Sequence, residues 1–195
     1  MGLLTRRRCA GYLAPLCMAG ISWAQSGGEP PLSAEHSEYE IESAMLYNFT
    51  KFVEWPKGAM GEAGVAVVVG VWGDDGLIPV LTAALRDKTI FGHPIAVRRL
   101  VSSADTKSCA VVLVGTSDKK EIARILQAVG PSPILTNDEH AQFSRLGGVI
   151  AFIRDGNRIR FEINMDAADR AGLQVSSKLL RLAVVWRASP AQVRN

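Results

Sequence analysis

The chain has 195 residues, of which 48% are hydrophobic and 21% are charged. This composition is typical of a globular protein and excludes the disordered, collagen-like and low-complexity classes. The net charge of +3 comes from Arg6, Arg7 and Arg8, because residues 1–24 contain no acid. Without these arginines, 19 basic residues face 19 acidic ones. We therefore expect no nucleic acid among the partners, since nucleic-acid binders concentrate positive charge to neutralise phosphates.

Residues 1–24 have the three-part pattern of a bacterial-type secretory signal peptide. A basic start is followed by an apolar run over residues 9–21, and the small residues Ser22 and Ala24 mark a cleavage site. The apolar run is too short for a membrane-spanning helix, which needs about 20 residues, although an uncleaved anchor is the alternative. We expect an exported, periplasmic protein that begins near Gln25.

Two of the three cysteines, Cys9 and Cys17, lie in the predicted signal peptide and would be removed with it. The exported chain then keeps only Cys109, so it can form no internal disulfide. Because Cys109 begins a strongly apolar run, we expect a buried and unreactive thiol. An intermolecular bridge in an oxidising compartment is the alternative.

Strands and helices alternate along the first two thirds of the exported chain. A stretch rich in Gly, Pro and Ser predicts a flexible leader over residues 25–37. Ser37 and Glu40 form a capping-box pair before an amphipathic helix, which ends ahead of Pro56. From apolar runs, caps and helical spacing we expect, in chain order, a strand at 65–72, a helix at 77–85, strands at 94–100 and 109–114, a helix at 118–129 and a strand at 133–136.

The last third is expected to contain a β-hairpin and short helical segments. The turn-forming sequence Asp155-Gly156-Asn157 separates two apolar runs, which is typical of a hairpin. Apolar residues at helical spacing predict a last helix with one buried face, formed by Leu179, Leu182, Ala183 and Trp186. In chain order, we expect a short helix at 138–145, strands at 149–153 and 158–163, a helical turn at 167–171 and the last helix at 177–186.

This order of elements predicts an α/β fold. We expect a single-domain sandwich with a mixed, mostly parallel sheet flanked by helices and with a late β-hairpin. The domain is expected over residues 38–187, and residues 188–195 would form a tail.

Motifs for catalysis or metal binding are weak. The loop from Gly73 to Gly76 follows a predicted strand, where phosphate or Mg²⁺ can bind, but a turn with a helix cap is the preferred interpretation. The three histidines are scattered and lack the spacing of a zinc site. Ser176 and Lys178 could pair as nucleophile and base, but Ser is a common helix cap. We therefore expect no catalytic residues, no metal, no cofactor and no enzymatic activity.

Polar residues concentrate in the segment 158–181. If the predicted hairpin forms, residues 158, 160, 162 and 164 share one strand face because they alternate with apolar residues. A solvated sheet face would explain this pattern. So would a binding patch, because Arg and Lys beside a Glu can orient an anion, a zwitterion or a partner's loop. The candidate partner- or ligand-binding residues are Arg160, Glu162, Asn164, Lys178 and Arg181.

The first predicted helix carries aromatic residues on more than one side. Tyr47, Phe49, Phe52 and Trp55 are therefore either core residues or contacts to a second subunit. The second interpretation agrees with a homodimer.

Four stretches of the sequence resemble the YfiR (HmsC-like) family. The first contains Glu38-Tyr39-Glu40 and the run Ala-Met-Leu-Tyr-Asn-Phe-Thr-Lys-Phe-Val-Glu-Trp-Pro at 44–56. The others follow in order: Gly92, Pro94 and Ile95 before Val97-Arg98-Arg99-Leu100; Gly147-Gly148-Val149-Ile150; and Arg158 to Asn164 leading to the run from Gly172 to Leu180. Together they span nearly all of the sequence from Glu38 to Leu182.

The resemblance implies a periplasmic regulator. Such a protein would bind the periplasmic sensor domain of an inner-membrane diguanylate cyclase, hold the cyclase inactive and so control cyclic-di-GMP synthesis and biofilm formation. The resemblance further implies an outer-membrane lipoprotein that sequesters the repressor, a small aromatic metabolite as ligand, and a homodimer. Members often carry a cysteine near the position of Gly70, as the disulfide partner of one like Cys109. This chain lacks that cysteine, so the redox tuning suspected for the family is not expected here.

Two other functions are alternatives to a regulator. The first is a stand-alone periplasmic small-molecule-binding protein, with the same polar patch holding a metabolite. An exported hydrolase is less favoured, because no set of nucleophile and base occurs in the sequence.

Overall fold

The computed structural model describes residues 34–140, 142–156 and 158–187. These residues belong to one unit of the chain, Leu32–Asn195. The predicted signal peptide, most of the predicted leader and the tail at 188–195 lie outside the described residues. Within the described part, no helix is both long enough and apolar enough to span a membrane.

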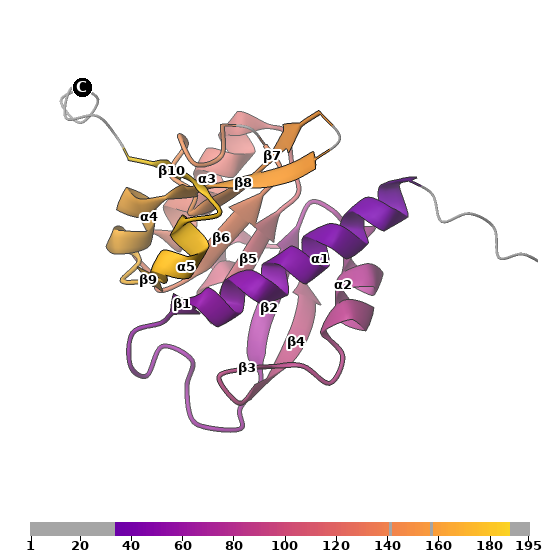
Figure 1. The fold of residues 1–195 in the computed structure, drawn as a ribbon. Coiled ribbons are helices and arrows are strands. Elements are labelled where there is room, and N and C mark those ends of the chain that lie inside the picture. Colours follow the sequence, from indigo (N-terminus) through magenta and orange to yellow (C-terminus); the bar gives the residue numbers. More distant parts are fainter. Residues whose placement is uncertain (1–33, 141, 157, 188–195) are drawn as a thin grey trace, which may run out of the picture. The chain divides into compact units, whose positions relative to one another are not determined.

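A mixed, mostly parallel sheet forms the centre of the fold, which confirms the predicted α/β class (Figure 1). The strands β4, β2, β5, β6 and β7 run parallel, whereas β8 turns back against β7 as the predicted hairpin. The eight strands lie in the order β10 (Val184–Trp186), β8 (Arg158–Asn164), β7 (Ile150–Asp155), β6 (Leu135–Asp138), β5 (Val111–Val114), β2 (Val67–Trp72), β4 (His93–Arg99) and β3 (Thr89–Ile90). A separate two-stranded sheet pairs β1 (Val53–Glu54) with β9 (Gln174–Val175).

Helices cover both faces of the large sheet. Figure 1 shows α1 (Ala34–Phe52) crossing one face, with α2 (Leu77–Leu85) and α5 (Ser177–Leu180) beside it. On the other face lie α3 (Lys119–Val129) and the 3₁₀ helix η1 (Ser103–Ser108), which pack on each other. The short helix α4 (Met165–Arg170) follows β8.

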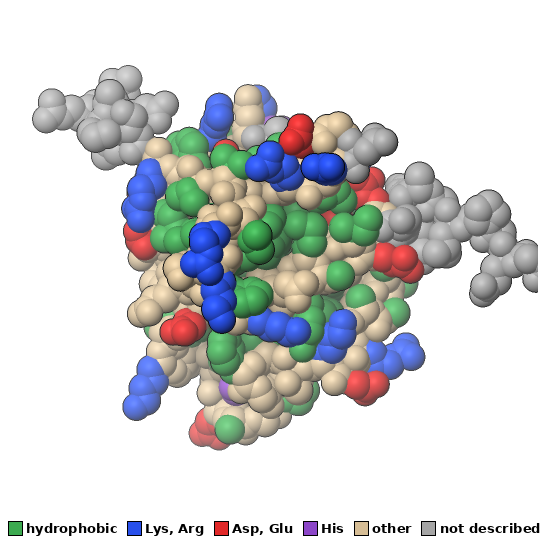
Figure 2. Space-filling view, in the orientation of Figure 1, with side chains coloured by type: hydrophobic (Ala, Val, Ile, Leu, Met, Phe, Trp, Pro, Cys, Tyr) green, Lys and Arg blue, Asp and Glu red, His purple; other side chains and the backbone are tan. Residues whose placement is uncertain are grey.

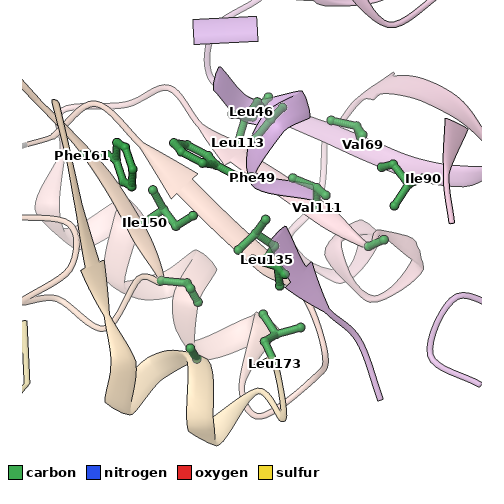
Figure 3. Packing of buried hydrophobic residues seen from close by; sticks show 14 of the residues in the cluster. Leu46, Phe49, Val69, Ile90, Val111, Leu113, Leu135, Ile150, Phe161 and Leu173 are labelled. Atoms are coloured by element: carbon green, nitrogen blue, oxygen red, sulfur yellow. The ribbon is translucent and has the colours of Figure 1, made fainter. Parts of the chain in front are cut away.

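Each face of the sheet has its own hydrophobic core. On the α1 face, Phe49 packs against Phe161 with ring centroids 4.8 Å apart, and Leu46 lies among the aliphatic residues of β2 and β5 (Figure 3). On the α3 face, Ile122 and Ile125 are fully buried beside residues of β5. Burying one full Leu, Ile or Phe side chain contributes about 1.5–3 kcal/mol, so these two cores supply most of the driving force for folding.

The ends of α3 show why local sequence predicts this helix well. The side chain of Asp118 accepts a hydrogen bond from the backbone N–H of Lys120 at 2.9 Å, which satisfies a free donor of the first turn. At the other end, Gly130 has φ of 57° and its N–H donates to the carbonyl of Leu126 at 2.9 Å. Glycine ends the helix there because other residues are strained at positive φ.

One predicted helix near the end of the chain is wrong, and the last helix is shorter than predicted. The described residues between β6 and β7 form turns, because Asp138 continues β6 and pairs with Ala151. The last helix ends at Leu180, and the chain then forms β10 in parallel pairing with β8. The pairing supplies backbone hydrogen bonds along one edge of Val184–Trp186. The helical spacing of apolar residues in this segment does not predict that pairing.

Candidate partner-binding surface

The five predicted binding residues fall into a buried pair and an exposed trio. Glu162 and Asn164 are only 7% and 1% exposed, whereas Arg160, Lys178 and Arg181 are exposed. The alternation along β8 is as predicted, since Phe161 and Ile163 join the core on the α1 face. The second half of the polar face is not solvated, however, because the loop before β7 packs against it.

Glu162 and Asn164 organise that loop. The hydroxyl of Ser144 donates to Glu162 Oε1, and Asn164 Nδ2 donates to the backbone carbonyl of Ser144 at 2.6 Å. Asn164 Oδ1 also accepts from the N–H of Ala167 at 2.9 Å and so caps α4. Both side chains form hydrogen bonds within the protein. Of the predicted binding residues, only the three exposed cations are therefore accessible to a partner.

The exposed cations flank a run of exposed aliphatic residues. Leu182, Val184 and Val185 are 71%, 40% and 48% exposed. Lys178 and Arg181 precede them on α5 and at its end. Val184 pairs with Glu162 and Val185 with Ile163, so the two valines point to opposite faces of the sheet and Val184 shares the face of Arg160. We call Arg160, Lys178, Arg181, Leu182, Val184 and Val185 the α5–β10 surface.

The α5–β10 surface combines exposed aliphatic residues, basic residues and the edge of a sheet. Among the described strands, β10 is the outermost one of the sheet, and no other described strand pairs with its outer edge. Edge strands present backbone N–H and C=O groups to which another chain can pair. Exposed aliphatic residues beside charged residues are common at protein interfaces. Figure 2 shows Lys and Arg side chains over the region of α5, next to hydrophobic side chains that reach the surface.

Sequence reasoning missed the aliphatic part of this surface. The sequence predicted Leu182 on the buried face of a helix, but the structure exposes it. The run Val184-Val185-Trp186 carries the signal that was overlooked, because β-branched and aromatic residues favour strands.

A cluster of carboxyl groups ties α1 to the ends of β6 and β7. Arg154 forms an ion pair with Glu38 and lies 3.9 Å from Glu139. Glu42, which is 5% exposed, forms a hydrogen bond with Glu139. Burial, together with repulsion from Glu139 and Glu38, raises the pKa of Glu42 to about 8, and burial also raises the pKa of Glu139. Glu42 therefore keeps its proton at neutral pH and can donate it to Glu139.

The loop after β2 forms a turn and a helix cap, as the preferred interpretation predicts. Asp74 Oδ1 accepts from the backbone N–H groups of Gly76 and Leu77 at 3.0 and 3.3 Å. Asp75 forms an ion pair with Arg99 at 2.9 Å. Among the residues that the structure describes, no group of three or more His, Cys, Asp and Glu side chains could hold a metal ion.

The remaining candidate nucleophiles have structural surroundings. Ser176 Oγ accepts from the N–H of Lys178 at 3.3 Å and so caps α5, which confirms the cap interpretation. Cys109 is free and 6% exposed, and burial raises the pKa of its thiol. A thiol with a raised pKa is a poor nucleophile, because the thiolate is the reactive form.

The chain is similar to one described protein family and to two solved structures. A family model described as YfiR/HmsC-like matches residues 39–184, from α1 to the first residue of β10. Two solved structures are similar: a conserved domain protein from Vibrio cholerae O1 biovar El Tor (13% identity, TM-score 0.52) and an ABC domain in complex with L-Trp from Streptococcus pneumonia (10% identity, TM-score 0.52). Each match covers 77% of this chain and 60% of the other. At these identities, the two structures demonstrate a shared fold only.

Proposed function

Because the chain belongs to the YfiR/HmsC-like family of periplasmic regulators, which are generally not enzymes, we propose that it represses an inner-membrane diguanylate cyclase. The repressor binds the periplasmic sensor domain of the cyclase and thereby limits cyclic-di-GMP synthesis and biofilm formation. An outer-membrane lipoprotein that sequesters the repressor and a second copy of the chain complete the proposed set of partners. The α5–β10 surface is the observation that supports binding of a protein.

A repressor of this kind acts by preferring the inactive state of its partner. Moving a two-state sensor from mostly active to mostly inactive requires about 5.5 kcal/mol of differential affinity. A standard protein interface of about 1,600 Å² is sufficient for such a difference. On this surface, Leu182 and Val185 supply apolar contacts, while Lys178 and Arg181 attract an acidic partner.

A binding assay with matched variants tests this proposal. The chain beginning at Gln25 is immobilised, and periplasmic domains of diguanylate cyclases from the same organism are passed over it in biolayer interferometry. Leu182→Asp should weaken binding at least tenfold, because it places a charge among the apolar contacts of the interface. Val101→Asp is the control, since Val101 is also exposed (77%) but precedes η1. Equal binding by the two variants would exclude the α5–β10 surface as the interface.

A cavity favours the second candidate function, a stand-alone periplasmic small-molecule-binding protein, although none of the five predicted binding residues lines this cavity. It measures about 340 Å³ and is lined by Trp55, Met60 and Phe91 among others. The ring of Phe91 is 59% exposed and stands edge-on to Trp55 at 6.3 Å, and Phe91 has φ of 49°, a backbone strain that is frequent at binding sites. A thermal shift with L-tryptophan that Phe91→Ala abolishes, without capture of any membrane protein by the tagged chain, would favour this function over the regulator.

A further inference from the structure

A second cavity, of about 460 Å³, lies between α3 and α4. Its wall comes from the C-terminal half of α3, the turn at Gly130 and Pro131, β6, the end of the loop before β7, and α4. The volume falls within the range of about 300–1,000 Å³ that is typical of small-molecule sites. The lining carries no aromatic ring and is mostly aliphatic, with Leu126, Val129, Ile134, Leu146, Val149, Ala167 and Ala171.

One charged group borders this cavity, and it is a cation. Arg170 is the charged residue of the lining, which contains no Asp or Glu. Its Nη2 lies 3.9 Å from the position that a Cβ would take on Gly147, another lining residue, so the guanidinium stands at the cavity wall. Glycine at this position, where φ is 108°, leaves the approach to the guanidinium open.

The nearby acids form ion pairs with another cation. Asp166 and Asp169, which lie on the same helix, form ion pairs with Arg187 at 3.2 and 3.3 Å. Arg170 itself forms no ion pair with any residue in the described part of the chain. A guanidinium without a direct ion pair beside an aliphatic cavity is complementary to a carboxylate that carries an aliphatic chain, because guanidinium binds carboxylate through paired, charge-assisted hydrogen bonds.

Two other polar groups of the wall are engaged in hydrogen bonds, whereas the amide of Gln127, also in the lining, is exposed. The hydroxyl of Thr136 accepts from the N–H of Val149 at 2.9 Å. The carbonyl of Val129, at the end of α3, accepts from Lys107 Nζ at 3.1 Å, which adds a second cation near the same end of the helix. A bound carboxylate therefore meets the guanidinium of Arg170, and the amide of Gln127 can donate a second hydrogen bond to it.

We propose that this cavity binds a small aliphatic carboxylate. The hydrocarbon part of the ligand lies among Leu126, Ile134 and Leu146, and its carboxylate accepts hydrogen bonds from Arg170. This site is separate from both the α5–β10 surface and the cavity at Trp55, so it adds a ligand to the proposed regulator.

Titration with sodium octanoate tests the proposal. Isothermal calorimetry on the chain beginning at Gln25 should show saturable binding of octanoate and much weaker binding of 1-octanol, which lacks the carboxylate. Arg170→Gln should weaken octanoate binding roughly ten- to a hundredfold, the value of one charge-assisted pair, whereas Arg170→Lys should keep part of it. Arg158→Gln is the matched control, because Arg158 is also exposed but lies on the hairpin. The unfolding midpoint of each variant is measured alongside, which separates loss of the ligand from loss of the fold.

A second variant tests the location of the site. Ala123 is an exposed residue of α3 that lines the cavity, so Ala123→Trp fills the space without disturbing the core. It should abolish octanoate binding while leaving the unfolding midpoint unchanged. Absence of octanoate binding to the wild-type chain, or equal binding by wild type, Arg170→Gln and Ala123→Trp, would overturn the proposal. The octanoate experiments and the cyclase-binding assay are independent, because the cyclase assay tests Leu182, which does not line this cavity.

Discussion

Replacing Gly70 with cysteine should create a disulfide to Cys109. An ideal Cβ on Gly70 lies 2.8 Å from the sulfur of Cys109, close to the spacing of about 3 Å that follows from an S–S bond of about 2.05 Å. In the chain beginning at Gln25, which lacks Cys9 and Cys17, no other thiol competes for the bond. The Gly70→Cys variant therefore restores the pairing that the family resemblance implies and that this chain lacks.

The expected stabilisation follows from the loop that the bond closes. Positions 70 and 109 enclose roughly 40 residues, for which the loss of chain entropy in the unfolded state is worth about 4 kcal/mol. The same Cβ would lie 2.7 Å from Leu100 Cδ1, so the buried Leu100 side chain has to shift. Overpacking of this kind costs about 1–3 kcal/mol. We expect the oxidised variant to exceed wild type by about 1–3 kcal/mol and the reduced variant to fall below wild type.

Urea unfolding of the oxidised and reduced protein measures both effects. The oxidised Gly70→Cys chain should unfold at higher urea than its reduced form, with a difference of about 4 kcal/mol in the free energy of unfolding. Gly70→Ser, which has a side chain of similar size and cannot cross-link, should behave like the reduced variant. Two free thiols by titration after oxidation, or identical unfolding of the two redox forms, would refute the geometry of Gly70 and Cys109.

Two further predictions concern buried carboxylates. Glu42 has a pKa of about 8 when folded against 4.5 when unfolded, so the folded state holds an extra proton between these values and its free energy of unfolding falls as pH rises from 4.5 to 8. In urea unfolding at pH 5 and pH 8, Glu42→Gln should reduce this change of the unfolding free energy with pH and should stabilise the protein at pH 8. The control Glu62→Gln, at an exposed position, should show the same change with pH as wild type. Ser144→Ala removes the hydrogen-bond donor of buried Glu162 and should lower the free energy of unfolding by about 1–3 kcal/mol; no change in the urea midpoint would show that this contact is dispensable.

The predicted binding residues illustrate the limit of reasoning from one strand. Alternation along β8 correctly assigns the even-numbered residues 158–164 to one face, because side chains of a strand point to opposite sides in turn. Alternation cannot tell which part of that face is covered. Ser144 covers Glu162 and Asn164, and it comes from a loop that was itself predicted to be a helix.

Most of the fold follows from local patterns in the sequence. The strands β2 and β5 are continuous runs of apolar, largely β-branched residues, and α3 carries Asp118 at its cap and apolar residues at helical spacing. These patterns act over a few neighbouring residues, because backbone preference, capping and one-sided burial depend on near neighbours. The α/β class and the positions of nearly all elements can therefore be predicted from the sequence.

Only the tertiary structure determined the conformation of residues 182–186 and the surroundings of Glu42. Residues 182–186 have an apolar pattern that fits a helix or a strand, and pairing with β8 selects the strand and exposes Leu182 and Val185. Glu42 and Glu139 both have raised pKa values because the fold buries them and brings them within hydrogen-bond distance of each other. In both cases the deciding contacts join segments that are distant in the chain, and the free energy of such contacts depends on burial and approach in three dimensions, which no local window of sequence contains.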